Sequence, residues 1–279
     1  MKKITRRSFL AAAGLTAAAL ALTACGGSSS STASSTASSA AASSEAASSS
    51  AAAELTTVEA GKLTMATNAA FPPYEMTTDT GAFEGIDMDT AQAIAEKLGL
   101  ELQIDDMDFD AALLSVQQGK ADIVMAGVTV TDERKAVMDF SDSYATGIQS
   151  IIVPEGSDIA TPDDLAGKKI GTQRGTTGYI YCSDDFGDEN VVAYDDGLTA
   201  VQALNNGQVD AVVIDNAPAK EFVAANPGLV ILDTSYAEED YAIGMAKGSA
   251  LEDAINATLE ELKADGTLQS IVDKYITAE

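Results

Sequence analysis

The chain has 279 residues and a formal net charge of −27, with 16 basic residues, 43 acidic residues and no histidine. This length accommodates one or two domains with a sizeable hydrophobic core. An acidic surface disfavours nucleic acid, because binding to phosphates depends on lysine and arginine. The lack of histidine removes the commonest general base and metal ligand, and Cys25 and Cys182 lack the spacing of a zinc site. We therefore expect no metal, no cofactor and no nucleic-acid partner.

Residues 1–24 have the pattern of an export signal. Four basic residues near the start precede an apolar run over residues 9–22, which is too short to span a membrane as a helix. The run ends in Leu22-Thr-Ala-Cys25, which resembles a bacterial lipobox and implies cleavage before Cys25 and attachment of diacylglycerol to its sulfur. Residues 5–10 also resemble a twin-arginine signal, so Sec export and twin-arginine export both stay open.

Residues 25–54 consist almost entirely of Ser, Ala, Thr and Gly. Such a composition cannot bury a core, so we expect a flexible linker between the lipid anchor and a folded part that begins near Leu55. Cys182 would be the only cysteine of that folded part, and it therefore cannot form an internal disulfide. We expect it to be a buried or partly buried thiol.

The first half of the folded part alternates strands with helices. The strands are expected over residues 62–67, 100–105 and 122–128. Helices are expected between them, one ended by Gly99 and the other over residues 111–118. This order is typical of a mainly parallel sheet with helices on its faces.

The third strand leads into the turn Ala126–Arg134, which precedes a helical segment. In open α/β sheets, ligands bind where strands end at the carboxyl edge. Thr129 adds a hydroxyl to this turn, and Arg134 adds a planar, permanently charged group that matches a carboxylate. The turn therefore predicts a socket for the α-carboxylate of a small molecule.

A second series of strands and helices follows. The elements share the alternation of the first half and are expected as strands over residues 148–153, 169–171, 191–194, 209–214 and 241–246, with helices over 197–205, 217–225, 249–264 and 268–275.

Several short segments, taken in order and spacing, carry a family resemblance from residue 55 to residue 275. They are Asn68–Glu75, Gly85–Asp89, Met107–Phe109, Ala126–Arg134, Asp139–Asp142, Gly175–Thr177, Asp210–Asp215 and Leu262–Gly266. Together they resemble the polar amino-acid-binding proteins of ABC importers, extracellular solute-binding protein family 3. The resemblance implies an α/β, type II periplasmic-binding-protein-like hinge fold, in which each of two lobes has a mainly parallel sheet flanked by helices. It places lobe 1 at residues 55–147 plus 244–279, and lobe 2 at residues 148–243.

The resemblance also implies a role for individual residues. Arg134, with Thr129 and the backbone of Ala126 and Gly127, would bind the α-carboxylate, and Asp215 would bind the α-ammonium group. Gly175 and Thr177 of the second lobe would reach the same carboxylate from across the cleft. The other expected ligand contacts are Gln173 and Thr176 of the second lobe, the aromatic pair Phe71 and Phe109 around the ligand side chain, and Tyr74 and Asn68 in the same pocket. Asn68 is uncharged where several relatives carry an acid, which favours a neutral polar ligand such as glutamine.

Structural interpretations of these residues stay open. Asp215 is well placed to cap the following helix, and Arg134 could pair with Asp132 or Glu133. Phe71 and Phe109 could be core residues. Asp87 and Asp89 are expected to form a structural turn and a helix cap.

The resemblance implies a monomeric receptor on the outer face of the cell membrane, anchored through Cys25. It would deliver an amino acid to permease subunits that work with a cytoplasmic ATPase, and it would not be an enzyme. One alternative is an enzyme on the same fold, similar to cyclohexadienyl or arogenate dehydratases, in which Glu75 or Lys168 would have to act as the acid–base group. Another alternative is an amino-acid sensor domain.

Overall fold

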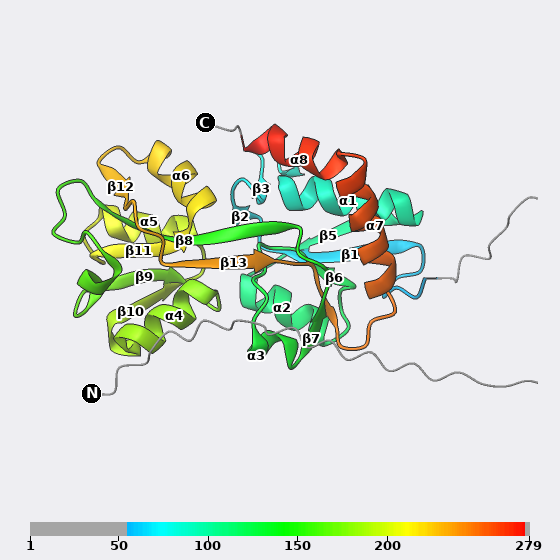
Figure 1. Ribbon diagram of the computed structural model, residues 1–279, viewed down its shortest axis with the longest axis horizontal. Helices are drawn as coiled ribbons and strands as arrows, with labels where there is room; N and C mark the ends of the chain where they lie inside the picture. The colour runs from blue at the N-terminus through cyan, green and yellow to red at the C-terminus, as the bar shows by residue number, and fades with distance from the viewer. Residues whose placement is uncertain (1–54, 277–279) are drawn as a thin grey trace, which may run out of the picture. The chain divides into compact units, whose positions relative to one another are not determined.

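The computed structural model describes residues 55–276 (Figure 1). The predicted signal peptide, the lipidation site Cys25, the linker and residues 277–279 lie outside this range. In the described part of the chain, no helix is both long and apolar enough to cross a membrane.

The first lobe is built on a five-stranded sheet with the strand order β5-β1-β6-β14-β7. Its strands are β1 (Lys62–Thr67), β5 (Glu101–Asp106), β6 (Ile123–Val124), β7 (Met138–Phe140) and β14 (Gly244–Ala246). Strand β1 pairs in parallel with β5 and β6, whereas β14 pairs antiparallel with β6 and β7. The helices of this lobe are α1 (Ile86–Leu98), α2 (Phe109–Gln117), α3 (Asp132–Lys135), α7 (Glu252–Ala264) and α8 (Thr267–Tyr275).

Two helical layers cover opposite faces of this sheet. Met65 points to a core that contains Ile94 of α1 and Leu259 of α7, whereas Ala66, the next residue along β1, packs with Ala112 of α2. Alternate residues of a strand face opposite sides, so α1 and α2 flank the sheet. Helix α1 ends at Gly99, whose left-handed φ of 71° is the helix end that the sequence predicts.

The second lobe has a six-stranded sheet with the order β10-β9-β11-β8-β12, and β13 also pairs with β8. Its strands are β8 (Ala145–Pro154), β9 (Ile170–Gln173), β10 (Val191–Tyr194), β11 (Ala211–Asp215), β12 (Leu229–Ile231) and β13 (Ala237–Tyr241). Its helices are α4 (Thr177–Phe186), α5 (Gly197–Asn205) and α6 (Asn216–Ala225), with 3-10 turns η1 (Pro162–Leu165) and η2 (Asp188–Asn190). Cys182 of α4 is fully buried against this sheet, as expected, and burial raises the pKa of its thiol to about 12.

A small three-stranded sheet stands at the edge of the first lobe, between β1 and α1. It consists of β2 (Ala70–Phe71), β3 (Glu75–Thr77) and β4 (Phe83–Glu84), and the Pro72–Pro73 turn joins the first two strands. Gly85 closes it against α1, because a side chain there would collide with the carbonyl of Tyr74.

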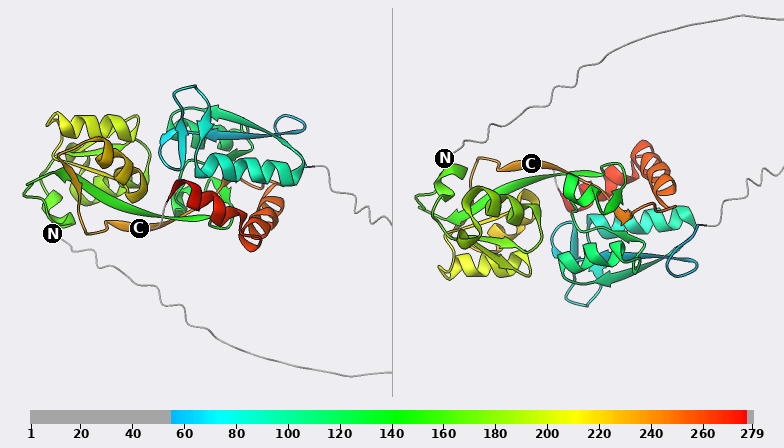
Figure 2. Two further views of the ribbon diagram at one scale, coloured as in Figure 1. Left: turned by 90° about the horizontal axis from the view of Figure 1, so that it is seen from above. Right: turned by 90° about the horizontal axis from the view of Figure 1, so that it is seen from below.

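Two long strands connect the lobes. β8 and β13 pair antiparallel from Ala145↔Tyr241 to Gln149↔Ala237, and they run together between the two lobes in Figure 1 and in both views of Figure 2. The two-lobed α/β fold is thus as predicted, but both sheets are mixed rather than mainly parallel, because β8 and β14 enter them antiparallel. The predicted boundary between residues 147 and 148 falls inside β8, so the division into 55–147 plus 244–279 and 148–243 remains a prediction.

Candidate ligand-binding site

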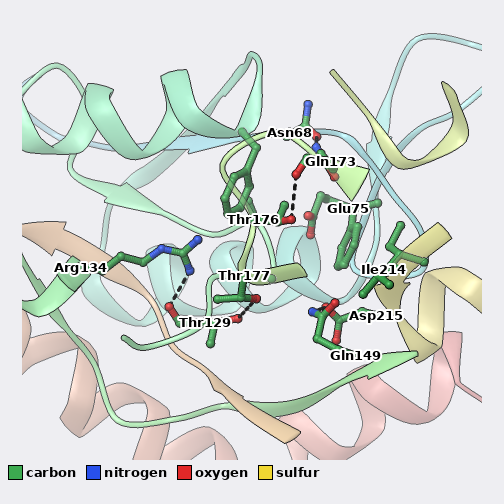
Figure 3. Close-up of a pocket in the computed structure, with 15 residues that line it drawn as sticks. Asn68, Glu75, Thr129, Arg134, Gln149, Gln173, Thr176, Thr177, Ile214 and Asp215 are labelled. Carbon is green, nitrogen blue, oxygen red and sulfur yellow. Dashed lines mark hydrogen bonds between the residues drawn. The ribbon is translucent and has the colours of Figure 1, made fainter. Parts of the chain in front are cut away.

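One pocket, with an empty volume of about 430 Å³, is lined by residues of both lobes. The lining residues are Asn68, Phe71, Glu75, Phe109, Ala126, Gly127, Thr129, Arg134, Gln149, Gln173, Thr176, Thr177, Val213, Ile214 and Asp215. Every predicted site residue except Tyr74 and Gly175 lies in this set. Arg134 stands at one end of the pocket, and Glu75 and Asp215 lie toward the other (Figure 3).

Arg134 is buried in the short helix α3, where the Thr131 hydroxyl accepts a hydrogen bond from its backbone N–H. Its guanidinium donates to the carbonyl of Thr129 at 2.7 Å and to that of Gly175 at 3.1 Å. It also lies 5.4 Å from the centre of the Phe109 ring. Burial lowers the pKa of Arg134, and none of the residues from 55 to 276 forms an ion pair with it. Two of its five N–H groups are used, so the others remain available to an anion.

The backbone beside Arg134 is held by a buried carboxylate. Asp87 of α1 accepts hydrogen bonds from the N–H of Gly127 at 3.1 Å and from the hydroxyl of Tyr144 at 2.8 Å. Gly127 has a left-handed φ of 55°, and a side chain there would meet the Phe71 ring at 2.8 Å. Asp87 is therefore structural, as expected, but it fixes the socket and is not a helix cap; the cap position of α1 is Gly85. Asp89 binds Lys274 instead of capping a helix.

Asp215 ends β11 and is 6% exposed. It occupies the cap position of α6, but its side chain makes no capping hydrogen bond. Instead, its Oδ2 accepts from Nε2 of Gln149 at 2.6 Å, and its Oδ1 has no hydrogen-bond partner in the part of the chain that the structure describes. Burial raises the pKa of Asp215 to about 7. The nearby Tyr241 hydroxyl partly offsets this rise in the pKa. The capping interpretation is therefore not supported.

Direct hydrogen bonds join the lobes around the pocket. Arg134 of the first lobe reaches the Gly175 carbonyl of the second. Gly175 has a left-handed φ of 75°, and a side chain there would press on Asp110 of α2 at 3.2 Å. It therefore acts through its backbone, outside the pocket lining. At another point, Nε2 of Gln173 donates to Oδ1 of Asn68 at 2.8 Å.

The sequence from residue 63 to residue 278 matches the model of the bacterial extracellular solute-binding proteins, family 3. The chain belongs to this family.

Relatives of this solute-binding protein differ in what they bind. The L-cystine-binding protein TcyJ of Escherichia coli K12 is 32% identical over 79% of this chain and 85% of its own. The structure of the arginine-, lysine-, histidine-binding protein ArtJ of Geobacillus stearothermophilus has a TM-score of 0.75 and 34% identity, over 78% of this chain and 96% of that one. An ancestral arginine-binding protein bound to glutamine has a TM-score of 0.75 and 41% identity, over 78% and 99%. These relatives are binding proteins, not enzymes.

Tyr74 does not line the pocket in which the sequence analysis placed it. Its ring stacks on Phe71 with centroids 5.9 Å apart and meets Tyr241 edge-on at 5.3 Å. Phe71 lines the pocket, whereas Tyr74 lies behind it and borders a separate hollow near α6 and α8. The prediction that Tyr74 lines the ligand pocket is therefore wrong, because the hairpin stacks one ring on the other.

Glu75 lines the pocket, although the sequence suggested it only as the acid–base group of an enzyme. It is fully buried beside the carboxyl group of Asp87, and no N–H or hydroxyl group among residues 55–276 donates to its carboxylate oxygens. Burial and the neighbouring Asp87 raise the pKa of Glu75 well above its ordinary value. Burial also raises the pKa of Asp87 to about 6. No sequence pattern indicates that a single acid after a proline turn is buried. Glu75 is buried because the β2–β3 hairpin turns its side chain toward the pocket.

Gln149 and Glu239 were also missed, and both come from the connecting strands. Gln149 of β8 lines the pocket and donates through one amide nitrogen to Asp215 at 2.6 Å and to Glu239 of β13 at 3.1 Å. The register between β8 and β13 brings Gln149 into the pocket lining and Glu239 within reach of the pocket residues Thr129 and Thr177. That register is a tertiary property, and the sequence pattern of an isolated strand does not reveal it.

Proposed function

We propose that this solute-binding protein captures a polar L-α-amino acid between its lobes, outside the cytoplasm, and delivers it to the permease of an ABC importer. The observation that carries the proposal is the pair Arg134 and Asp215, one buried cation and one buried acid on the walls of a single pocket. Each has unused hydrogen-bonding capacity, and a zwitterion presents the two complementary charges. Relatives that bind cystine, cationic amino acids or glutamine support this ligand class.

The ligand side chain would extend toward Phe71, Phe109, Asn68 and Glu75. The Asn68 amide suits a neutral polar side chain such as that of glutamine. Glu75 adds a buried carboxyl group beside Asp87, and no N–H or hydroxyl group among residues 55–276 donates to it. Its charged form would be stabilised by a donor and most strongly by a cationic one. We therefore infer a side chain that donates hydrogen bonds, and we expect arginine to bind more tightly than glutamine.

A thermal-shift screen of the purified protein against the L-amino acids and cystine tests the proposed function. A ligand at one hundred times its dissociation constant adds about 2.7 kcal/mol to the free energy of unfolding. We expect arginine to give the largest shift. A screen in which no amino acid raises the melting temperature would overturn the proposal and would reopen the enzyme and sensor interpretations.

Replacing Glu75 by glutamine tests the choice of ligand. Glu75→Gln keeps the volume and removes the carboxyl group that a cationic ligand would hold in its charged form, so affinity for arginine should fall about tenfold while that for glutamine changes by less than about threefold. Calorimetry with both ligands measures the two changes. Glu84→Gln, the same change at an exposed position of β4, serves as the control. Equal losses for both ligands would show that Glu75 does not select for charge.

We also infer that the protein acts as a monomer held at the membrane by lipidated Cys25, with the Ser/Ala-rich segment as its tether. The lipobox-like residues support this anchoring. Cys25→Ser should give an unlipidated protein that is released from the cells. Fractionation of cells that express the variant measures this, and a variant that stays in the membrane fraction would refute the anchor.

A further inference from the structure

A carboxylate occupies the donors of the predicted carboxylate socket. Glu239 of β13 is buried, and its Oε2 accepts hydrogen bonds from the hydroxyls of Thr129 and Thr177, both at 2.9 Å. Thr129 belongs to the first lobe and Thr177 to the second, and the two hydroxyl oxygens are 3.4 Å apart. Gln149 donates to the same Oε2 at 3.1 Å. Glu239 thus gathers one donor from each lobe and one from the other connecting strand.

Thr129 and Thr177 cannot donate to Glu239 and to a ligand at the same time. A threonine hydroxyl has a single proton to donate. While Thr129 and Thr177 donate to Glu239, neither can donate to a ligand carboxylate. The family resemblance, however, assigns both threonines to the α-carboxylate of the ligand. Only one of the two carboxylates can hold these protons at a given moment.

The negative charge of Glu239 also opposes the binding of a ligand carboxylate. Glu239 is an acid that holds two of the threonines of the pocket, and two like charges close together in a buried site repel each other. Its negative charge also acts on Arg134, where it partly offsets the burial that lowers the pKa of the guanidinium. Glu239 and a ligand carboxylate therefore compete for the same hydroxyl donors and for the positive charge of Arg134.

We propose that Glu239 is an internal competitor for the α-carboxylate of the ligand, and that the ligand binds by drawing the hydroxyls of Thr129 and Thr177 away from it. This inference rests on the proposed function. The two hydroxyls rotate to the ligand, and Glu239 keeps the amide of Gln149. Because Glu239 lies on β13, the exchange links the ligand carboxylate to a strand that joins the lobes. Glu239 is in this sense a positioning residue that lowers affinity for acids.

The test compares L-arginine with L-argininamide, which lacks the carboxylate, by calorimetry. In Glu239→Gln, the ratio of the dissociation constant of the amide to that of the acid should rise about tenfold, the size of one hydrogen bond to a charged group. A merely structural role would weaken both ligands and leave the ratio unchanged. Glu238→Gln, the same change at the exposed neighbouring position, should leave it unchanged as well.

Two further measurements keep the outcome decisive. Glu239→Asp draws the carboxylate back by one methylene and retains a buried acid, so it should raise the same ratio if Glu239→Gln does not fold. A wild-type protein that binds neither L-arginine nor L-glutamine would overturn the proposed function. A wild-type protein that binds L-arginine, with a ratio that stays constant or falls in the folded variants, would overturn the role of Glu239 alone.

Discussion

Arg134→Ala is expected to weaken binding of the amino acid by about 3–5 kcal/mol, because it leaves a buried ligand carboxylate without its cation. Arg134 is buried, and among residues 55–276 its guanidinium is bound to backbone carbonyls and to no acid. The ion pair with the ligand would therefore be the main charge interaction of this side chain. Isothermal titration calorimetry with the ligand found in the screen measures the loss.

The matched control for this variant is Arg174→Ala. Arg174 lies just beyond β9, is about half exposed, and sits 3.4 Å from the exposed Asp195. A surface pair of this kind contributes about 0–1 kcal/mol, so binding should stay close to that of the wild type. If Arg134→Ala and Arg174→Ala bind the ligand equally well, Arg134 is not the carboxylate receptor.

Asp215→Asn is expected to weaken the binding of amino acids strongly and at the same time to stabilise the unliganded protein at neutral pH. The loss of binding follows from removing the charge opposite the ammonium group. The deaminated analogue of the ligand, which has no ammonium group, should lose much less affinity. Equal losses for both compounds in calorimetry would contradict the assigned role.

The gain in stability follows from the raised pKa of Asp215, which is about 7 instead of the ordinary 3.8. Below about pH 4 the carboxyl of Asp215 is protonated in both the folded and the unfolded chain, so it makes no difference to the free energy of unfolding. Between pH 4 and pH 7 the folded state binds the proton more tightly, and the wild type loses stability as the pH rises, by up to about 4 kcal/mol. Asparagine has no charge to bury, so the advantage of the variant should be full above pH 7 and absent near pH 4.

Denaturant unfolding of both proteins at pH 4, 6 and 8 measures this advantage. Asp184→Asn, on the exposed surface of α4, is the control and should show no such pH dependence. An Asp215→Asn protein that is less stable than the wild type at pH 8 would mean that the carboxylate is compensated by contacts other than that of Gln149.

The family resemblance predicted the two-lobed fold and most of the pocket lining, and the turn Ala126–Arg134 carries in addition a local signal of its own, a strand end at the edge of a sheet. Ala126, Gly127, Thr129 and Asp215 all lie where strand ends predict a site. The prediction of a strand over residues 122–128 was too long. Only Ile123–Val124 pair in the sheet, since Gly127 turns the chain outward.

The features that the sequence did not predict depend on contacts between distant segments. Tyr74 turns away from the pocket because Phe71 covers it, and Glu75 turns inward with the same hairpin. Gln149 lines the pocket and Glu239 reaches its threonines because β8 and β13 pair in one register, which no local pattern encodes. The sheets are mixed for the same reason, since the strands between the lobes return in the opposite direction.

The ladder between β8 and β13 limits how the lobes can move. Two separate linkers would allow the lobes to twist and slide independently, but the five paired positions from Ala145↔Tyr241 to Gln149↔Ala237 tie them into one ribbon. A hydrogen-bonded ribbon bends more easily than it shears, so we expect the lobes to move mainly by hinge bending of this ribbon. Gln149 of this ribbon lines the pocket, and Glu239 accepts hydrogen bonds from the pocket residues Thr129 and Thr177. A substitution at either residue is therefore expected to change both the affinity for the ligand and the bending of the ribbon.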